Sequence, residues 1–216
     1  MYRGMWLAGV ASVVLIASVP ARAGIIVSIT SVSDAAGTNG DALDVTIQNT
    51  GSSAQNIAGF DLGLSVASSN ILFTGGNEST ALTYLFSGDS FDIDLPTSLT
   101  SVPPPNGQTV QASDFSNSGN GTNLAAGATL GLGHIIFNVA GGTTPGPITV
   151  TLAASACNVS LVPCTDLSDS NFNTVAFTAV NGTITVTGAI SGVPEPASGL
   201  LAGLALAAIV AVRLRG

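Results

Sequence analysis

Residues 59–66 read GFDLGLSV, and this stretch decides the fold of the chain. Its apolar side chains, Phe60, Leu62, Leu64 and Val66, are separated by small or polar residues. Successive side chains of a β-strand point to opposite faces, so strict alternation predicts a strand with one face buried. We therefore expect this segment to cover a hydrophobic core with one side and to face solvent with the other.

The same kind of pattern recurs along most of the chain. ALDVTIQ at 42–48 alternates in the same way, and clusters of Gly, Asn, Ser and Pro separate it from further strand-like runs. These runs are IIVSITSV (25–32), NILFTG (70–75), ALTYLFS (81–87), TVQAS (109–113), TLGLGHIIFNV (129–139), PITVTLAAS (147–155) and TVAFTAV (174–180). About nine short strands in one domain of this length predict an all-β fold, a single antiparallel β-sandwich.

A hairpin is predicted near the end of these runs. TVAFTAV is followed by Asn181-Gly182 and then by TITVT. Asn-Gly between two alternating runs favours a two-residue type I′ turn. The predicted cross-strand pairs, which place the apolar residues of both strands on one face, are Ala179 with Ile184 and Phe177 with Val186.

The run TLGLGHIIFNV differs because it is apolar at both parities over residues 130–139. Such a strand suits the centre of a sheet that is covered on both sides. It carries His134, the single histidine, in line with Leu130, Leu132 and Ile136. We interpret His134 as a core or edge-of-core residue, because a Ser-His-Asp triad would have to be built around it and the chain has no GxSxG motif.

Charge restricts the function of the body. The chain has four basic and twelve acidic residues, a formal net charge of −8 at pH 7, and no Lys or Arg lies between residues 24 and 212. Sequence-independent nucleic-acid binding rests on Lys and Arg, so that class of function is excluded. The acidic surface is expected to be solvated and to keep an exported protein soluble through self-repulsion.

The first 23 residues have the three parts of a secretory signal peptide. A basic start with Arg3 precedes an apolar segment, residues 5–19, and Ala21 and Ala23 then form an A-x-A cleavage site. We expect the general secretion machinery to export the chain and signal peptidase to cleave it before Gly24.

The end of the chain has the character of a membrane anchor. Residues 197–212 carry no charge and are followed by Arg213 and Arg215. A helix of that length spans about 24 Å, which suffices for a core of about 30 Å when flanking arginines reach the interface. The positive-inside rule places Arg213 and Arg215 in the cytoplasm and the body outside.

Pro194-Glu195-Pro196, the apolar segment and the basic end occur in one order, which resembles the PEP-CTERM sorting signal of Gram-negative bacteria that secrete exopolysaccharide. The resemblance implies that exosortase, a membrane-embedded cysteine transpeptidase, reads Pro194, Glu195 and Pro196, and that the helix is a temporary anchor. A permanent C-terminal anchor is the alternative.

The body carries a second resemblance. The segments GDALDVTIQNT (40–50), GFDLGLSV (59–66), LGLGHIIFNV (130–139) and NGTITV (181–186) are similar to the framework of cohesin-type and carbohydrate-binding-module-type sandwiches. This implies a cohesin-like jelly roll. The expected domains are a signal peptide (1–23), a β-sandwich (24–188), a linker (189–193) and the sorting signal (194–216) with its transmembrane helix (197–212).

Two cysteines occur, Cys157 and Cys164. An even number in an exported chain favours a disulfide over a reactive thiol or a metal site. Two free buried thiols are the alternative.

An acidic cluster lies in SGDSFDIDLP, residues 87–96. If this stretch is extended, Asp92 and Asp94 project to the same side with Asp89 nearby, and hard oxygen ligands of this kind suit Ca²⁺. The stretch doesn't match an EF-hand loop, and a solvated acidic loop is the alternative. No other metal or cofactor is expected.

Few aromatic side chains remain for a sugar platform. Trp6 and Tyr2 leave with the signal peptide, so the mature chain keeps Tyr84 as its single amphipathic ring. Phenylalanines such as Phe60 and Phe137 lie in apolar strands, and we expect them in the core together with Phe177.

Three classes of function remain. The first is a non-enzymatic structural or adhesive protein, exported to the cell surface or the extracellular matrix and associated with exopolysaccharide or biofilm. The second is a glycan- or protein-binding module, whose binding either depends on Ca²⁺ or is independent of it. A hydrolase comes third, because no catalytic residues are identified.

Overall fold

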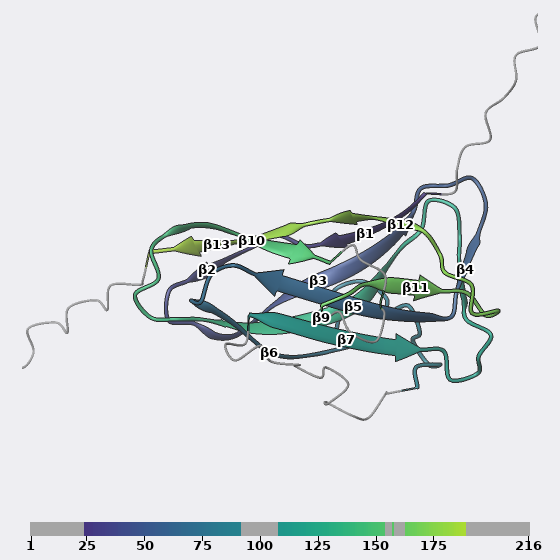
Figure 1. The fold of residues 1–216 in the computed structure, drawn as a ribbon, viewed down its shortest axis with the longest axis horizontal. Coiled ribbons are helices and arrows are strands. Elements are labelled where there is room, and N and C mark those ends of the chain that lie inside the picture. Colours follow the sequence, from purple (N-terminus) through teal and green to yellow (C-terminus); the bar gives the residue numbers. More distant parts are fainter. Residues whose placement is uncertain (1–23, 92–107, 154–156, 158–162, 189–216) are drawn as a thin grey trace, which may run out of the picture.

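The computed structural model describes residues 24–91, 108–153, 157 and 163–188 (Figure 1). The predictions for the signal peptide (1–23) and for the linker, sorting motif and tail helix (189–216) lie outside the described residues. The described part consists of β-strands and turns, and no helix in it is long and apolar enough to cross a membrane. The predicted all-β sandwich is confirmed.

One layer of the sandwich is a five-stranded sheet. Its order is β12-β1-β3-β9-β6, so that β3 lies at its centre and β9 lies between β3 and the edge strand β6. The bounds are β12 (Phe177–Val180), β1 (Ile25–Ile29), β3 (Asn39–Asn49), β9 (Thr129–Val139) and β6 (Ile71–Asn77). Apart from the parallel pair β1–β12, its neighbours are antiparallel.

The second layer is built around the strand with the alternating sequence, β5 (Gly59–Val66). One side of β5 pairs with β7 (Thr109–Phe115), and the other side pairs with β11 (Asp166–Ser168) and then with β10 (Gly146–Leu152). Beyond β10 lie β13 (Gly182–Thr187) and β2 (Val32–Ala35). A separate two-stranded sheet contains β4 (Gln55–Ile57) and β8 (Thr122–Leu124).

The core fills the space between the two layers. In β5, Leu62 and Leu64 are fully buried, as the alternation predicts, and Phe60 is buried with them. Val45 of β3 and Ile135 of β9 meet them from the other layer in one contiguous cluster. The outer faces of both sheets carry side chains that do not belong to this core.

The predicted hairpin at Asn181-Gly182 is wrong. β12 and β13 belong to different sheets: β12 pairs parallel with β1, and β13 pairs antiparallel with β10 and parallel with β2. Ala179 therefore lies opposite Val27, and Ile184 lies opposite Ile148 and Val32. Alternation was informative about which faces are buried, but it doesn't determine which strand is the neighbour.

The chain crosses from one sheet to the other at Gly182, and the close packing at this crossing leaves no room for a side chain, so glycine is required there. A Cβ atom at Gly182 would overlap Ile29 and lie 2.9 Å from the carbonyl oxygen of Thr30. The predicted strand 25–32 is divided at the same place into β1 and β2. The chain thus changes sheets between β1 and β2 and again between β12 and β13. The sandwich therefore contains two parallel pairs, β1–β12 and β2–β13, instead of being wholly antiparallel.

The predicted strand at residues 81–87 is also wrong. This segment consists of turns, with one isolated bridge between Tyr84 and Gly131. Tyr84, Leu85 and Phe86 are all buried, and three consecutive buried side chains cannot point to one face of a strand.

The strand at 129–139 is confirmed with a correction to its parity. The register between β3 and β9 passes from Val45–Gly133 to Thr46–Gly131 and leaves Leu132 as a bulge. Leu132 is buried in the core, whereas the side chain of His134 lies on the outer face and is 31% exposed. The bulge therefore puts His134 on the opposite face from Leu132, while Ile136 stays on the same face as His134.

Candidate functional site

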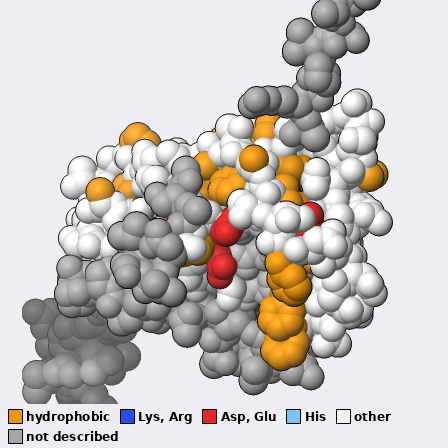
Figure 2. Space-filling model, turned by 45° about the vertical axis from the view of Figure 1, so that its right-hand side comes forward, with side chains coloured by type: hydrophobic (Ala, Val, Ile, Leu, Met, Phe, Trp, Pro, Cys, Tyr) orange, Lys and Arg blue, Asp and Glu red, His pale blue; other side chains and the backbone are white. Residues whose placement is uncertain are grey.

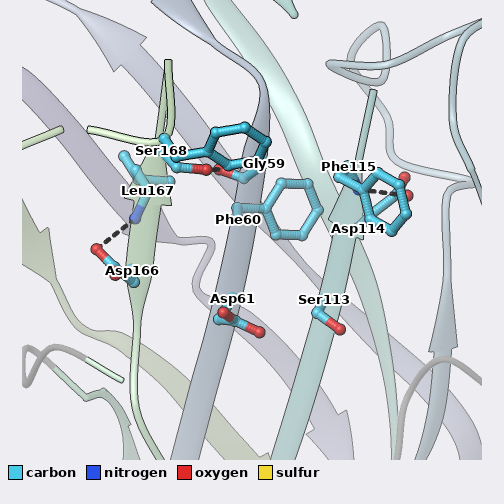
Figure 3. Close-up of a pocket in the computed structure, with 10 residues that line it drawn as sticks. Gly59, Phe60, Asp61, Ser113, Asp114, Phe115, Asp166, Leu167 and Ser168 are labelled. Atoms are coloured by element: carbon cyan, nitrogen blue, oxygen red, sulfur yellow. Dashed lines mark hydrogen bonds between the residues drawn. The ribbon is translucent and has the colours of Figure 1, made fainter. Parts of the chain in front are cut away.

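The outer face of β11, β5 and β7 carries a shallow pocket of about 440 Å³ (Figure 3). Two rows of side chains cross these strands. One row joins Asp166, Asp61 and Ser113, and the other joins Ser168, Gly59 and Phe115. The floor of the pocket is thus polar at one end and bounded by an aromatic ring at the other.

Asp61 and Asp166 face each other as direct partners on neighbouring antiparallel strands. Burial, and after it the negative charge of Asp166, raises the pKa of the Asp61 carboxyl. The described residues contain no Lys or Arg, so this part of the chain supplies no basic side chain to compensate the pair. A ligand that brings a hydrogen-bond donor or a positive charge would do so.

Exposed phenylalanines border the pocket. Phe172 lines it and is 92% exposed, and Phe115 is 49% exposed. Phe115 stacks on Phe91, with ring centroids 4.3 Å apart, and Phe91 is 61% exposed. Figure 2 shows a face of the molecule on which a column of hydrophobic side chains stands beside acidic ones. The core position expected for Phe60 and Phe137 is confirmed, and Phe177 is partly buried against the core, whereas these three phenylalanines are exposed.

Hydrogen bonds to Asp169 hold the loop that carries Phe172. The Asp169 carboxylate accepts hydrogen bonds from the backbone N–H groups of Asn171 and Asn173 at 2.8 and 2.9 Å, and from the Asn173 amide. These hydrogen bonds, chiefly that of the Asn173 side chain, lower the pKa of Asp169. Phe172 has a φ of 61°, which is uncommon for a bulky residue. An exposed aromatic ring on a strained but well-bonded loop is a feature of functional surfaces.

The predicted disulfide between Cys157 and Cys164 is confirmed, with Cα atoms 5.0 Å apart. Cys164 lies on the same outer face, directly over Gly63, where any side chain would overlap its backbone. Gln111 of β7 holds it there, because the Gln111 side chain donates to the Cys164 carbonyl and accepts from its N–H. The disulfide segment therefore closes one end of the face that carries the pocket.

Asp89 is the described member of the predicted calcium cluster. Its carboxylate accepts hydrogen bonds from the hydroxyls of Ser116 and Ser118 and from the Ser118 N–H at 2.9 Å. These bonds, led by the one from Ser116, lower its pKa. Asp92 and Asp94 lie outside the described residues. Among the described residues, no group of three or more His, Cys, Asp or Glu side chains could hold a metal.

His134 contacts the Asp44 carboxylate, with 2.7 Å between Nδ1 and Oδ1. The other oxygen of Asp44 accepts the N–H of Ala81 at 2.7 Å. In the described part of the chain, these are the contacts that the His134–Asp44 pair makes through its side chains, and neither involves a serine or threonine hydroxyl. The pair thus fastens residue 81 to the outer face of the five-stranded sheet.

Sequence reasoning missed one buried polar group. Asp114 is 7% exposed and accepts hydrogen bonds from the hydroxyls of Tyr84 and Ser90, each at 2.6 Å. Its signal was available, because Asp114 shares the parity of Val110 and Ala112 along β7. A carboxylate in line with core residues predicts a buried hydrogen-bonded acid.

Comparisons with known proteins concern the fold. No protein-family model and no curated protein matches the chain. Among solved structures, the type I cohesin Coh-OlpA of Clostridium thermocellum, solved with dockerin Doc918, is 14% identical with a TM-score of 0.54, and the match covers 76% of this chain and 99% of that one. The sixth cohesin of scaffoldin B from Acetivibrio cellulolyticus, in complex with a Cel5 dockerin, is 13% identical with a TM-score of 0.53, over 76% and 99%.

A third similar structure is the cohesin CaCohA2 from Clostridium acetobutylicum, which is 16% identical with a TM-score of 0.52 and is matched over 76% of this chain and 92% of that one. At such low identity these matches establish the fold alone. The body of this protein is an all-β sandwich of the cohesin type.

Proposed function

We propose that the body is a non-enzymatic module that binds a protein partner through the outer face of β11, β5 and β7. The observation that carries the proposal is the exposure of Phe172 and Phe115 at the border of the polar pocket. Aromatic anchors that border a partly desolvated polar centre are typical of binding hot spots.

Electrostatics indicates the chemistry of this partner. Asp61 and Asp166 are adjacent and lack a basic partner within the described residues. A partner that brings Lys, Arg or backbone N–H groups would relieve their repulsion, and complementary charge also speeds association. The solved cohesins named above, two of them in complex with a dockerin, support a protein ligand more than a glycan.

We further propose that the protein acts outside the cytoplasm. The signal peptide would direct export, and the tail would hold the precursor in the inner membrane until exosortase reads Pro194, Glu195 and Pro196. The processed body would then serve at the cell surface or in the extracellular matrix, where it would contribute to adhesion or biofilm structure beside exopolysaccharide. Replacement of Glu195 by Ala should leave export intact and prevent release in a fractionation blot, and equal release would refute the sorting part.

The binding proposal is tested with a photo-crosslinking residue at Ser113, on the pocket floor, and at Leu82 as a control position. Leu82 is 43% exposed and lies on the segment that covers the other sheet. Ser113 should capture one partner that Leu82 does not capture. The affinity of the purified partner should fall at least about tenfold for Phe172→Ser and remain unchanged for Leu82→Ser.

Two results would contradict the binding proposal. One is equal affinity for the Phe172→Ser and Leu82→Ser proteins. The other is binding on a glycan array that depends on Phe172 and Asp61 while no protein is captured at Ser113, which would make the module a lectin.

A further inference from the structure

Two carboxyls and two hydroxyls meet where an edge of one sheet lies against an edge of the other. β6 is the last strand of the five-stranded sheet, β7 pairs with β5 alone among the described strands, and β6 and β7 lie side by side. Glu78 directly follows β6, Asp114 belongs to β7, and the turns between the two strands carry Tyr84 and Ser90. Tyr84, Ser90 and Asp114 are buried, and Glu78 is half-buried.

The Ser90 hydroxyl connects the two carboxyls. Its Oγ atom lies 2.6 Å from Oε1 of Glu78 and 2.6 Å from Oδ2 of Asp114. The same Oδ2 atom accepts the hydroxyl of Tyr84 at 2.6 Å, and Oδ1 of Asp114 accepts the N–H of Phe115 at 2.7 Å. Four side-chain oxygens are thus joined by three short contacts.

These three contacts need three hydrogens, and the two hydroxyls supply only two. A separation of 2.6 Å between two oxygens is that of an O–H···O hydrogen bond, so a hydrogen must lie between them. A serine hydroxyl has one hydrogen and cannot donate to Glu78 and to Asp114 at once. The carboxyl that does not receive this hydrogen must itself carry a proton and donate to Ser90, because an ionised carboxylate only accepts.

We propose that Glu78 and Asp114 hold one bound proton between them through Ser90. Asp114 accepts from Tyr84, Ser90 and the Phe115 N–H, and three donors stabilise a carboxylate. Glu78 is therefore the member that carries the proton: it donates to Ser90, and Ser90 donates to Asp114. We call this arrangement the Glu78–Ser90–Asp114 bridge, and it forms whether or not the pocket binds a partner.

The charged groups around the bridge favour retention of the proton. Asp89, on the same turn as Ser90, is a carboxylate that two serine hydroxyls engage. Asp61 lies on β5 beside β7, and His134, which pairs with the residue before Glu78, is engaged by Asp44. The described residues contain no Lys or Arg. With acidic neighbours and no free side-chain cation among the described residues, a carboxyl is favoured in its neutral form.

The bridge fastens the edges of the two sheets to each other and holds the aromatic border of the pocket. Directly after Ser90, the N–H of Phe91 donates to the carbonyl of Phe115 at 3.0 Å, and the two rings stack. Loss of the proton to solvent would leave two carboxylates that face one serine hydroxyl, and the half-buried Glu78 would turn outward. The stabilisation by the bridge is therefore present at low pH and is lost as the pH rises.

Infrared difference spectroscopy of the full-length protein tests the proton directly. At about pH 5.5 an ordinary Glu side chain is more than about nine-tenths ionised. The spectrum of the wild type minus that of Glu78→Gln should still contain the carbonyl band of a protonated carboxyl at this pH. Asp89→Asn is the matched control on the same turn, and its difference spectrum should contain carboxylate bands only, because hydrogen bonds lower the pKa of Asp89. Carboxylate bands alone for Glu78→Gln would overturn the proposal.

Thermal unfolding of a double-mutant cycle tests the part of Ser90. The amide that Glu78→Gln introduces donates a hydrogen at any pH, so the Tm of this variant minus that of the wild type should rise from near zero at about pH 4 to about 2–4 °C at about pH 8. In the Ser90→Ala background this rise should disappear. An equal rise in both backgrounds would assign the effect to the removal of one negative charge and would overturn the proposal, as would a Glu78→Gln protein less stable than the wild type at the higher pH.

Discussion

The two outer faces of the sandwich differ in the residues that lie over them. On the five-stranded sheet, residues 80–83 lie over β9, where Thr80 packs on Gly131 and Ala81 is fastened to Asp44. On the other sheet, Pro163 and Cys164 lie over Gly63, and the described residues beside them, among them Asp61 and Phe172, line the pocket. The chain covers one face with its own residues and leaves exposed aromatic side chains on the other, which indicates where a ligand is accommodated.

The largest effect is expected where another segment's backbone lies directly over a glycine of the sheet. Gly63→Ala places a methyl group against the backbone of Cys164, which cannot rotate away. We expect a loss of about 3 kcal/mol in the free energy of unfolding. Gly59→Ala is the matched control on the same strand, because its Cβ would lie 3.0 Å from a rotatable Ser168 hydroxyl. Denaturant unfolding measures both, and similar losses would refute the distinction.

Removal of the disulfide should have the next largest effect. Replacing both Cys157 and Cys164 by Ala opens a short loop, for which the chain-entropy model gives a loss of about 2.5 kcal/mol. The loss should disappear when wild type and variant are compared under reducing conditions. The segment over Gly63 should also become accessible, so that proteolysis within residues 153–166 is faster in the variant.

The pair on the closed face should contribute less. His134→Gln removes the hydrogen bond to Asp44 but leaves the one from Ala81, so we expect a loss of about 1 kcal/mol at pH 7. Hydrogen exchange at the Ala81 amide should become faster, while partner binding at the open face stays unchanged. A loss of binding in this variant would show that the two faces are not independent.

The smallest effect concerns Asp61 and depends on pH. Because its pKa is raised in the folded state, ionised Asp61 lowers stability at neutral pH, and this penalty disappears as the pH falls and the carboxyl is protonated in both states. Asp61→Asn should stabilise the fold at pH 7 by less than about 1 kcal/mol, since solvent screens the partly exposed pair. The gain should vanish near about pH 3, below the usual Asp pKa.

The contribution of Asp169 to stability should depend on pH in the opposite direction from that of Asp61. Its pKa is lowered by the hydrogen bonds from Asn173, so its contribution to stability is present above the usual Asp pKa and is lost as the pH falls through the lowered value. Asp169→Asn should therefore destabilise the loop of Phe172 at pH 7, and the two Asp→Asn variants should respond to acid in opposite directions. Thermal unfolding from pH 3 to pH 7 distinguishes them.

Much of the sandwich could be predicted from local alternation. β5 and β9 were located from their sequences, and the pairing of Cys157 with Cys164 followed from their number and the predicted export. The hairpin failed because Asn181-Gly182 satisfies a turn preference at a place where packing against Ile29 demands a crossover. The prediction placed His134 on the same face as Leu132. The bulge at Leu132 shifts the alternation by one residue, so that His134 points to the opposite face.

The candidate site was largely hidden from sequence reasoning. Asp61 and Asp166 become neighbours only through the pairing of β11 with β5, which no local pattern encodes. Phe91 and Phe172 lie in turns, where composition alone gives no reason to expect an exposed ring. The strained backbone and the hydrogen bonds of Asp169 identify Phe172, and both are visible only in three dimensions.

The parallel pairs have a mechanical consequence. Ile25 pairs with Phe177 and Ala35 with Thr187, at one constant offset in sequence, so the first and last strands run side by side along the length of the molecule through both sheets. Tension applied between Gly24 and Gly188 therefore loads their hydrogen bonds in shear, all at once, instead of opening them one by one. A body tethered at its C-terminal end and pulled from the other would resist unfolding through its two terminal strands.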